Sequence, residues 1–359
     1  MRHAAMAIVL FSVALASAAR GDEPCRPAAC RPAWAGIYPT VVLPWACPGQ
    51  VDVPALLAQV DYHLAGGVHG LLLLGTVGEG EQADLAEREV VLRTVHQHVQ
   101  GRVPIIVGIH TDDVHVARDQ MRQAQELGAA AVLIKYTPRG CVRFSHVCNF
   151  YRWLAATRIL PIFIYYFPSQ TGLEMSPDQL AQLLRLPGVV GIKESILDLD
   201  HVRKQMELAG RSDLAFLSGT ALNLTQFQAI GGHGAMCPEA LLLPGPTVAA
   251  WRAVYEQGWI DEARRRQREL FVVAPLLTRQ PVTTRTARFA TMLSQDLRLA
   301  QQVGPEATPA RLKYALSGLG VPMSPLVKPP LEQLGSLERL RIDWQLPALR
   351  RVAGQPSLP

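Results

Sequence analysis

The stretch "GVVGIKES", residues 188–195, carries a short apolar run that leads directly into Lys193. The run does not alternate with polar residues, which is typical of a strand buried on both faces of a parallel sheet. Seven further runs of the same kind, most of them rich in Ile, Val and Leu, occur along the chain. They are GIYPTVVL (36–43), GLLLLG (70–75), PIIVGI (104–109), AAVLIK (130–135), PIFIYY (161–166), LAFLSG (214–219) and GAMC (234–237). The sequence therefore predicts eight buried parallel strands.

Amphipathic segments with helix-capping residues separate these runs. Residues 84–99 place apolar side chains near one helical face, and residues 112–128 open with carboxylates and stop at a glycine. Residues 176–188 open with Ser and then Pro, the usual first helical residue. Strand–helix units in succession predict the α/β class and a closed (β/α)8 TIM barrel. An open doubly wound sheet would need a Gly-x-Gly-x-x-Gly turn after its first strand, and LPWACPGQ (43–50) does not supply one.

The chain divides into three parts by composition. Residues 1–35 are predicted to be a signal-like leader and linker, residues 36–258 the barrel, and residues 259–359 a C-terminal helical extension. Helical patterns extend past the last strand. They cover residues 246–258, 260–274, 286–304 and 308–320.

The N-terminus has the layout of a secretory signal peptide. A short basic start precedes an apolar stretch from Ala4 to Ala16, and Ala16-Ser17-Ala18 resembles a cleavage site. Cleavage would make the protein periplasmic or secreted, and Cys25 and Cys30 could then form a small loop disulfide. The alternative is a mis-assigned translation start on a cytoplasmic protein. No other segment is predicted to cross a membrane.

Composition excludes several classes of function. The 359 residues are 49% hydrophobic and 18% charged with a net charge of +5, and no basic stripe interleaved with aromatics predicts nucleic-acid binding. The sequence has no C-x-x-C pair, so a structural zinc site is not expected. The histidines of "HQH" (96–98) and "HTDDVH" (110–115) are interpreted as ordinary solvated residues, and no metal site is predicted.

Polar residues at the ends of the predicted strands are the candidates for chemistry, because barrel enzymes place reactive groups there. They are Thr40, Gly75, Thr76, Lys135, Tyr165, Lys193, Ser218 and Gly219. Only five of the 35 basic residues are lysines, so Lys193 in a chain that prefers arginine is notable. Partial burial would favour its neutral amine, which can attack a ketone to form a Schiff base, whereas arginine cannot. The structural alternative is a strand-end cation paired with Glu194 or Asp198.

Two neighbouring features favour the chemical interpretation. Tyr165 ends the fifth strand, adjacent to the strand of Lys193, and its phenol could shuttle protons beside an imine. The segment LGTVGEGE (74–81) presents Thr76 and backbone N–H groups that could hold a carboxylate.

These motifs together resemble the pyruvate-dependent class I lyase family that includes dihydrodipicolinate synthase and N-acetylneuraminate lyase. The resemblance runs from about Gly36 to about Leu334. It rests on GTVGEG (75–80), YYFPSQTG (165–172), GIKE (191–194), LSGTA (217–221) and LKYALSGLG (312–320).

The resemblance implies a role for each site residue. Lys193 would form the Schiff base with pyruvate or another 2-oxo acid, Tyr165 would relay protons, and Thr76 would connect Tyr165 to solvent or to a partner subunit. The backbone of Val77 and Gly78 would hold the carboxylate. It also implies a homotetramer and no metal or organic cofactor, because the lysine itself is the electron sink.

Several positions depart from the family pattern. Gln170 stands where the synthase has an arginine that binds the carboxylate of the aldehyde substrate, and Val77 replaces a hydroxyl residue. Arg139-Gly140 replaces the tyrosine pair after the fourth strand, and residues 275–308 are longer than expected. Lys135 is predicted to compensate by meeting an acidic group of the second substrate, and the alternative is a surface cation on the loop.

The sequence thus predicts a Schiff-base lyase that makes or breaks a bond next to the carbonyl of a 2-oxo acid. Aldol cleavage, condensation and dehydration remain open, with Ser218 and Gly219 as further substrate-binding candidates. The alternatives are a true 4-hydroxy-tetrahydrodipicolinate synthase, which Gln170 disfavours, and an exported barrel that binds a 2-oxo acid or sugar acid without turning it over.

Overall fold

The eight apolar runs form eight parallel strands in a computed structural model that describes residues 31–277 and 308–354. The strands are β1 (Gly36–Pro39), β4 (Leu71–Leu73), β5 (Ile105–His110), β6 (Ala131–Lys135), β7 (Ile162–Tyr166), β8 (Val189–Glu194), β9 (Ala215–Ser218) and β10 (Gly234–Cys237). They pair in the order β1-β10-β9-β8-β7-β6-β5-β4. Thr40, just after β1, bridges to Leu72 of β4, and the N–H of Val41 donates to the Leu72 carbonyl at 2.9 Å. These bonds join the two ends of the sheet, so the predicted TIM barrel is confirmed.

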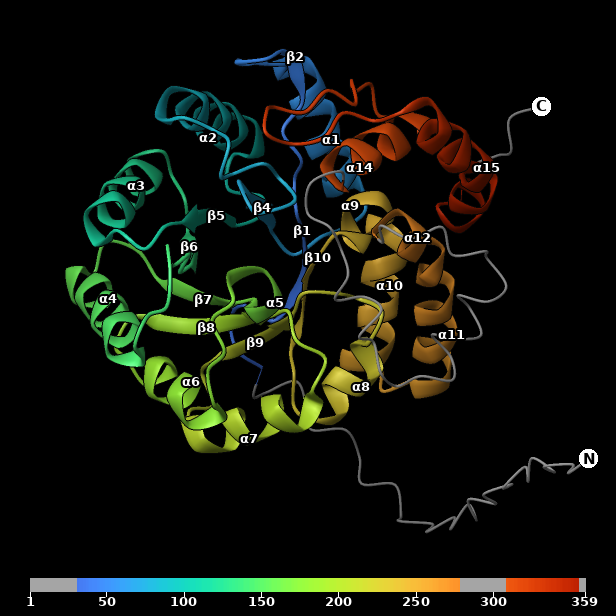
Figure 1. The fold of residues 1–359 in the computed structure, drawn as a ribbon. Coiled ribbons are helices and arrows are strands. Elements are labelled where there is room, and N and C mark those ends of the chain that lie inside the picture. The colour runs from blue at the N-terminus through green and yellow to red at the C-terminus, as the bar shows by residue number, and fades with distance from the viewer. Residues whose placement is uncertain (1–30, 278–307, 355–359) are drawn as a thin grey trace, which may run out of the picture. The chain divides into compact units, whose positions relative to one another are not determined.

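Helices surround the strands on the outside of the barrel (Figure 1). They are α1 (Val53–Ala65), α2 (Leu85–Val99), α3 (Val114–Glu126), α4 (Phe144–Thr157), α6 (Pro177–Leu184), α7 (Leu199–Ala209), α8 (Leu224–Ala229), α9 (Glu239–Leu242) and α10 (Pro244–Tyr255). The short helix α5 (Pro168–Thr171), which follows β7, lies inside this ring of helices. The predicted caps are present: Asp84 and Ser176 each form a capping box, with Glu87 and Gln179 respectively, and Asp113 caps α3.

The chain between β1 and α1 differs from the prediction. Strand β1 ends at Pro39, not at residue 43, and the backbone of Val42 bonds to a side chain instead of a neighbouring strand. Gln59 of α1 accepts from the Val42 N–H at 3.0 Å and donates to its carbonyl at 2.9 Å. A small antiparallel hairpin follows, formed by β2 (Trp45–Cys47) and β3 (Gln50–Val51), which the sequence did not predict.

Apolar side chains fill the interior of the barrel in a cluster separate from the layer between strands and helices. Phe163 of β7 pairs in register with Gly191 of β8, and a Cβ atom on Gly191 would lie 2.6 Å from the Phe163 ring. The space left by Gly191 therefore accommodates this ring. Trp34 packs edge-on against Phe163, with ring centroids 5.4 Å apart.

The C-terminal part is helical, as predicted. It contains α11 (Ile260–Leu270), the 3-10 helix η2 (Phe271–Val273), α12 (Ala274–Leu277), α14 (Thr308–Gly318) and α15 (Ser336–Val352). Helix α14 packs against α9, α12 and α15 (Figure 1). The expected boundary between residues 258 and 259 falls between α10 and α11 and stays a prediction.

Two sequence predictions fall outside the described residues: the leader up to residue 30 and the helix at 286–304. Among the described helices, none combines the length and the apolar character needed to span a bilayer.

Candidate active site

Lys193 and Tyr165 lie side by side at the C-terminal ends of neighbouring strands. They are register partners in β8 and β7, and the Lys193 Nζ atom lies 4.3 Å from the centroid of the Tyr165 ring. Both residues are only 6% exposed. Tyr165 belongs to the apolar cluster inside the barrel, so the amine of Lys193 is held against a buried phenol in the barrel interior.

The surroundings of Tyr165 lower the pKa of its phenol. Burial by itself raises the pKa of a tyrosine, but the charges of Lys193 and Lys135 and hydrogen bonds to Ser195 and Lys193 act in the opposite direction. The net effect is a lowered pKa. A phenol with a lowered pKa next to a buried amine can exchange protons with it.

The two carboxylates that could have paired with Lys193 are engaged elsewhere. Glu194 accepts a short hydrogen bond from Gln205 of α7, and burial raises the pKa of Glu194 to about 8. Asp198 caps α7 by accepting from the His201 N–H at 2.9 Å. These contacts give no support to the structural interpretation of Lys193.

The loop after β4 brings Thr76, Val77 and Gly78 to the same end of the barrel. Glycine is required at two places in it, because a Cβ on Gly78 would lie 2.4 Å from the Val41 carbonyl oxygen and one on Gly80 would lie 1.9 Å from that of Leu74. The backbone therefore passes close to its neighbours here. Thr76 and Val77 are half-buried, and Gly78 is buried.

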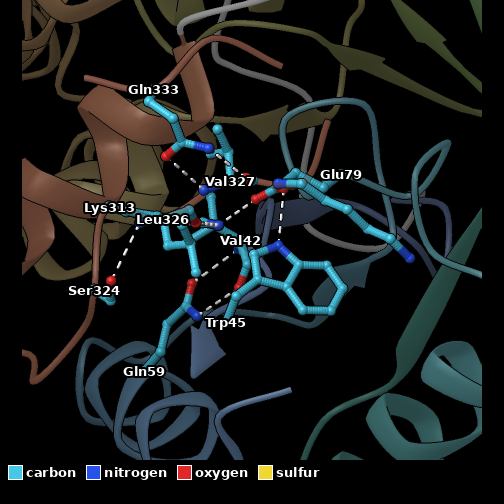
Figure 2. A network of polar contacts seen from close by, with 10 residues as sticks. Val42, Trp45, Gln59, Glu79, Lys313, Ser324, Leu326, Val327 and Gln333 are labelled. Atoms are coloured by element: carbon cyan, nitrogen blue, oxygen red, sulfur yellow. Dashed lines mark hydrogen bonds and ion pairs between the residues drawn. The ribbon is translucent and has the colours of Figure 1, made fainter. Parts of the chain in front are cut away.

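The buried carboxylate of Glu79 connects this loop to the C-terminal part of the chain (Figure 2). Glu79 is fully buried and accepts from the Trp45 indole at 2.9 Å and from the Lys328 N–H at 3.0 Å. It also forms an ion pair with Lys313 of α14, which is itself fully buried. Burial lowers the pKa of Lys313 to about 8, although Glu79 acts to raise it. The C-terminal part thus holds the loop that carries Thr76, which the sequence did not reveal.

Lys135, at the end of β6, links three of the predicted site segments. Its Nζ atom donates to Thr76 Oγ1 at 3.1 Å, to Gln170 Oε1 at 2.6 Å and to Glu81 Oε1 at 2.5 Å. The residue is 1% exposed, and its Nζ atom lies 5.9 Å from the Tyr165 ring centroid. The structure therefore brings Lys135, Thr76 and Gln170 together beside Tyr165, with Glu81 as a partner that sequence reasoning missed.

The interpretation of His110 as a solvated residue is wrong. Its side chain is 1% exposed, its Nδ1 atom lies 3.7 Å from Glu81 Oε1, and its Nε2 atom bonds the Leu74 carbonyl at 3.0 Å. Burial lowers the pKa of His110 to about 3, and the charge of Lys135 adds to this effect. His110 is the last residue of β5, one position beyond the predicted strand, which places its ring at the site.

The remaining candidates lie differently. Leu217 belongs to the interior cluster, so Ser218, the next residue, points to the opposite face of β9. The Ser218 hydroxyl donates to Asn223 at 3.0 Å, and the Gly219 N–H donates to the Glu194 carbonyl at 2.6 Å. Neither group is directed at Lys193. Thr40 is buried at 1% exposure, and its hydroxyl has no hydrogen-bond partner among the described residues.

Comparison with known proteins identifies the relatives of the chain. The model of the dihydrodipicolinate synthetase family matches residues 33–287. The chain belongs to this family. The resemblance inferred from the strand-end motifs is thereby confirmed, and members of the family are pyruvate-dependent lyases of the class I aldolase type.

Individual relatives agree with the family assignment. The chain is 30% identical over 222 residues to the 4-hydroxy-tetrahydrodipicolinate synthase of Alkaliphilus oremlandii, covering 60% of this chain and 73% of that protein. It is 29% identical over 290 residues to the enzyme of the same name from Phenylobacterium zucineum, covering 81% and 89%. Among solved structures, YagE from E. coli K12, a family member in complex with pyruvate, has a TM-score of 0.75 at 23% identity, covering 89% of this chain and 99% of that one. The structural likeness supports the fold.

Proposed function

We propose that Lys193 forms a Schiff base with pyruvate or another 2-oxo acid and that the chain then makes or breaks a bond next to the former carbonyl. The observation that carries this proposal is the buried pair of Lys193 and Tyr165, with the amine 4.3 Å from the phenol ring. A lysine amine held beside a group that can exchange protons is the arrangement that Schiff-base catalysis needs.

The chemistry follows from these two groups. The neutral amine attacks the keto carbon, and loss of water gives an iminium ion. Loss of a proton from the adjacent carbon then gives an enamine, because the iminium nitrogen accepts the electron pair. When the enamine carbon attacks an aldehyde, a carbon–carbon bond forms, and the aldehyde oxygen takes a proton from Tyr165. Water finally releases the product from Lys193, and the reverse sequence is aldol cleavage.

The loop after β4 would hold the carboxylate of the 2-oxo acid. The N–H groups of Val77 and Gly78 are the candidate donors, and Thr76 lies next to them at the rim. The buried hydroxyl of Thr40, at the end of β1, is a further donor on this side of the barrel. Val77 leaves only its backbone for this role.

The activity of a true 4-hydroxy-tetrahydrodipicolinate synthase is the first alternative, supported by the names of relatives at about 30% identity. Gln170 disfavours this activity, because an amide cannot make the charged, bidentate contact of an arginine with a carboxylate. A barrel that binds 2-oxo acids without turnover is the second alternative, favoured by Val77, Gln170 and the solvent-exposed Arg139.

Borohydride reduction in the presence of pyruvate tests the proposal. We expect a stable mass gain that peptide mapping assigns to Lys193, and none in the Lys193→Met variant. Lys204→Met removes an exposed lysine of α7 and serves as the control that keeps the adduct. A wild-type protein that gains no mass with any of a panel of 2-oxo acids would support the binding alternative.

Three further features belong to this proposal. The reaction would need no metal or organic cofactor, because the iminium is the electron sink, so turnover should survive dialysis against EDTA. We also propose a homotetramer, which the family resemblance implies and light scattering can check. Export with cleavage of the leader can be checked by N-terminal sequencing of the protein from its native host.

A further inference from the structure

Two buried lysines contact the same phenol, but their charges are compensated differently. Lys193 Nζ lies 4.3 Å and Lys135 Nζ 5.9 Å from the centroid of the Tyr165 ring. Lys135 also forms an ion pair with Glu81 at 2.5 Å, while Thr76 and Gln170 accept its other two protons. An ammonium group has three donors, so this set of acceptors satisfies Lys135 completely.

The charged and titratable groups around this pair are His110, Arg88 and Arg139, and the buried Arg88 donates to the Gly108 carbonyl at 3.1 Å. His110 lies 3.7 Å from Glu81, but burial lowers the pKa of His110 to about 3, so its ring is neutral at physiological pH. Arg139, in the loop after β6, is directed to solvent with a side chain 88% exposed, and it pairs with Asp112 at 3.8 Å. The charge of Lys135 beside Tyr165 is therefore already compensated by Glu81.

Gln170 determines which hydrogen bonds the site beside Tyr165 can offer. Its carbonyl oxygen accepts from Lys135, which leaves its amide N–H2 group as a donor. Glu81 is 39% exposed and keeps acceptor capacity on its carboxylate. A donor and an acceptor next to each other match hydroxyl groups, which both donate and accept.

We infer that the second reactant, the aldehyde that the Lys193 adduct would attack or release, is an uncharged carbonyl compound bearing hydroxyl groups and not one bearing a carboxylate. This inference rests on the proposed Schiff-base function. A carboxylate on the aldehyde would have to displace Glu81 from Lys135, and two carboxylates near one ammonium repel each other. Hydroxyl groups can bind Gln170 and Glu81 while the ion pair of Lys135 and Glu81 stays intact. The site would therefore discriminate between aldehydes both by repelling a second carboxylate and by binding hydroxyl groups.

Condensation with two probe aldehydes tests the inference. At saturating pyruvate, we expect kcat/KM for D-glyceraldehyde to exceed that for succinic semialdehyde by roughly tenfold or more, as expected for a site with groups placed to bind hydroxyls. The Glu81→Gln variant frees the charge of Lys135, so the ratio should shift toward succinic semialdehyde by about tenfold. Adding Lys135→Met to Glu81→Gln removes that charge and should abolish the shift.

Glu89→Gln is the control. It removes an exposed carboxylate of α2, paired with Arg93, and should leave the ratio of kcat/KM for the two aldehydes unchanged. Borohydride trapping of pyruvate is run on every variant, and its failure in wild-type protein would refute the Schiff-base function itself. If trapping succeeds but wild type prefers succinic semialdehyde, condenses neither aldehyde, or keeps its ratio in Glu81→Gln, the inference is wrong while the Schiff-base function stands.

Discussion

The two strand-end lysines differ in what their neighbours allow. Lys135 donates to three acceptors including a carboxylate, so all three of its N–H groups are engaged. Lys193 has the phenol of Tyr165 as its close neighbour, and both candidate carboxylates are occupied by other groups. A keto carbon can approach an amine that lies beside a proton-exchanging phenol, whereas the Lys135 Nζ atom is already surrounded by three acceptors. Of the two, Lys193 is therefore the lysine that we propose to form the Schiff base.

Replacing Tyr165 by Phe should lower kcat by about 100-fold or more, because general acid–base transfer typically contributes that much. Pyruvate should still form a reducible adduct on Lys193, but more slowly. Steady-state kinetics and time-resolved borohydride trapping measure the two effects. Tyr38→Phe is a matched control, since the Tyr38 hydroxyl donates to the Trp34 carbonyl and not to the site. Equal turnover in wild type and Tyr165→Phe would remove Tyr165 from the mechanism.

Residues at strand ends could be predicted from the sequence, and their loop partners could not. Lys193, Tyr165 and Lys135 end apolar runs, so the position of each side chain follows from the strand itself. Glu81 sits in a loop, and His110 opens a polar segment that looks solvated. Where these two side chains point depends on tertiary packing, which has no local pattern.

At the scale of elements, the loop after β4 depends on a distant part of the chain. Glu79 at its base is buried with Lys313 of α14, and Trp45 and the Lys328 backbone complete its contacts (Figure 2). Breaking a buried pair by removing one partner leaves an uncompensated charge and typically costs about 3–5 kcal/mol. The position of Thr76, Val77 and Gly78 should therefore depend on Lys313.

The Lys313→Met variant should raise KM for pyruvate more than it lowers kcat, because Lys313 positions the loop and touches no reacting atom. Its unfolding free energy should fall by about 3–5 kcal/mol. Adding Glu79→Gln removes the stranded carboxylate and should restore part of both losses. Denaturant unfolding and pyruvate titrations provide the measurements.

Lys204→Met, an exposed lysine on α7, is the control for loss of a lysine as such. A Lys313→Met protein that is less stable but has an unchanged KM for pyruvate would show that the pair only stabilises the fold.

The order of the elements followed from the sequence, but some connections did not. Apolar runs located all eight strands, because burial on both faces leaves a continuous local signal. The β2–β3 hairpin is too short to have such a pattern. Strand β1 ends at Pro39, and the Val42 backbone bonds to Gln59 of α1 instead of a neighbouring strand, which only the folded chain could show.

For the whole molecule, the buried titratable groups make contributions of opposite sign to the pH dependence of folding stability. Burial lowers the pKa of His63 and of His233 to about 4, so the unfolded chain binds more protons between that pH and about 6.5. Stability contributed by these groups therefore rises as pH increases through that window. Glu194 has the opposite sign: burial raises its pKa to about 8, so the folded chain holds its proton more tightly and stability falls between about pH 4.5 and 8.

The thermal stability of the protein should accordingly peak near pH 6.5 and decline toward pH 8. Three histidines act below the peak, because burial lowers the pKa of His110 to about 3 as well, and together they outweigh Glu194. Above the peak, Glu194 lowers stability until Lys313, whose pKa burial lowers to about 8, begins to lose its proton. Burial also raises the pKa of Glu239, which therefore has the same sign as Glu194. Glu194→Gln keeps the amide contact with Gln205 possible but removes the titration. Its melting temperature should exceed that of wild type at pH 8 by about 5–10 °C, which corresponds to roughly 2–4 kcal/mol, and the two should converge near pH 5. A parallel decline of both proteins between pH 6.5 and 8 would mean that Glu194 does not control this side of the curve.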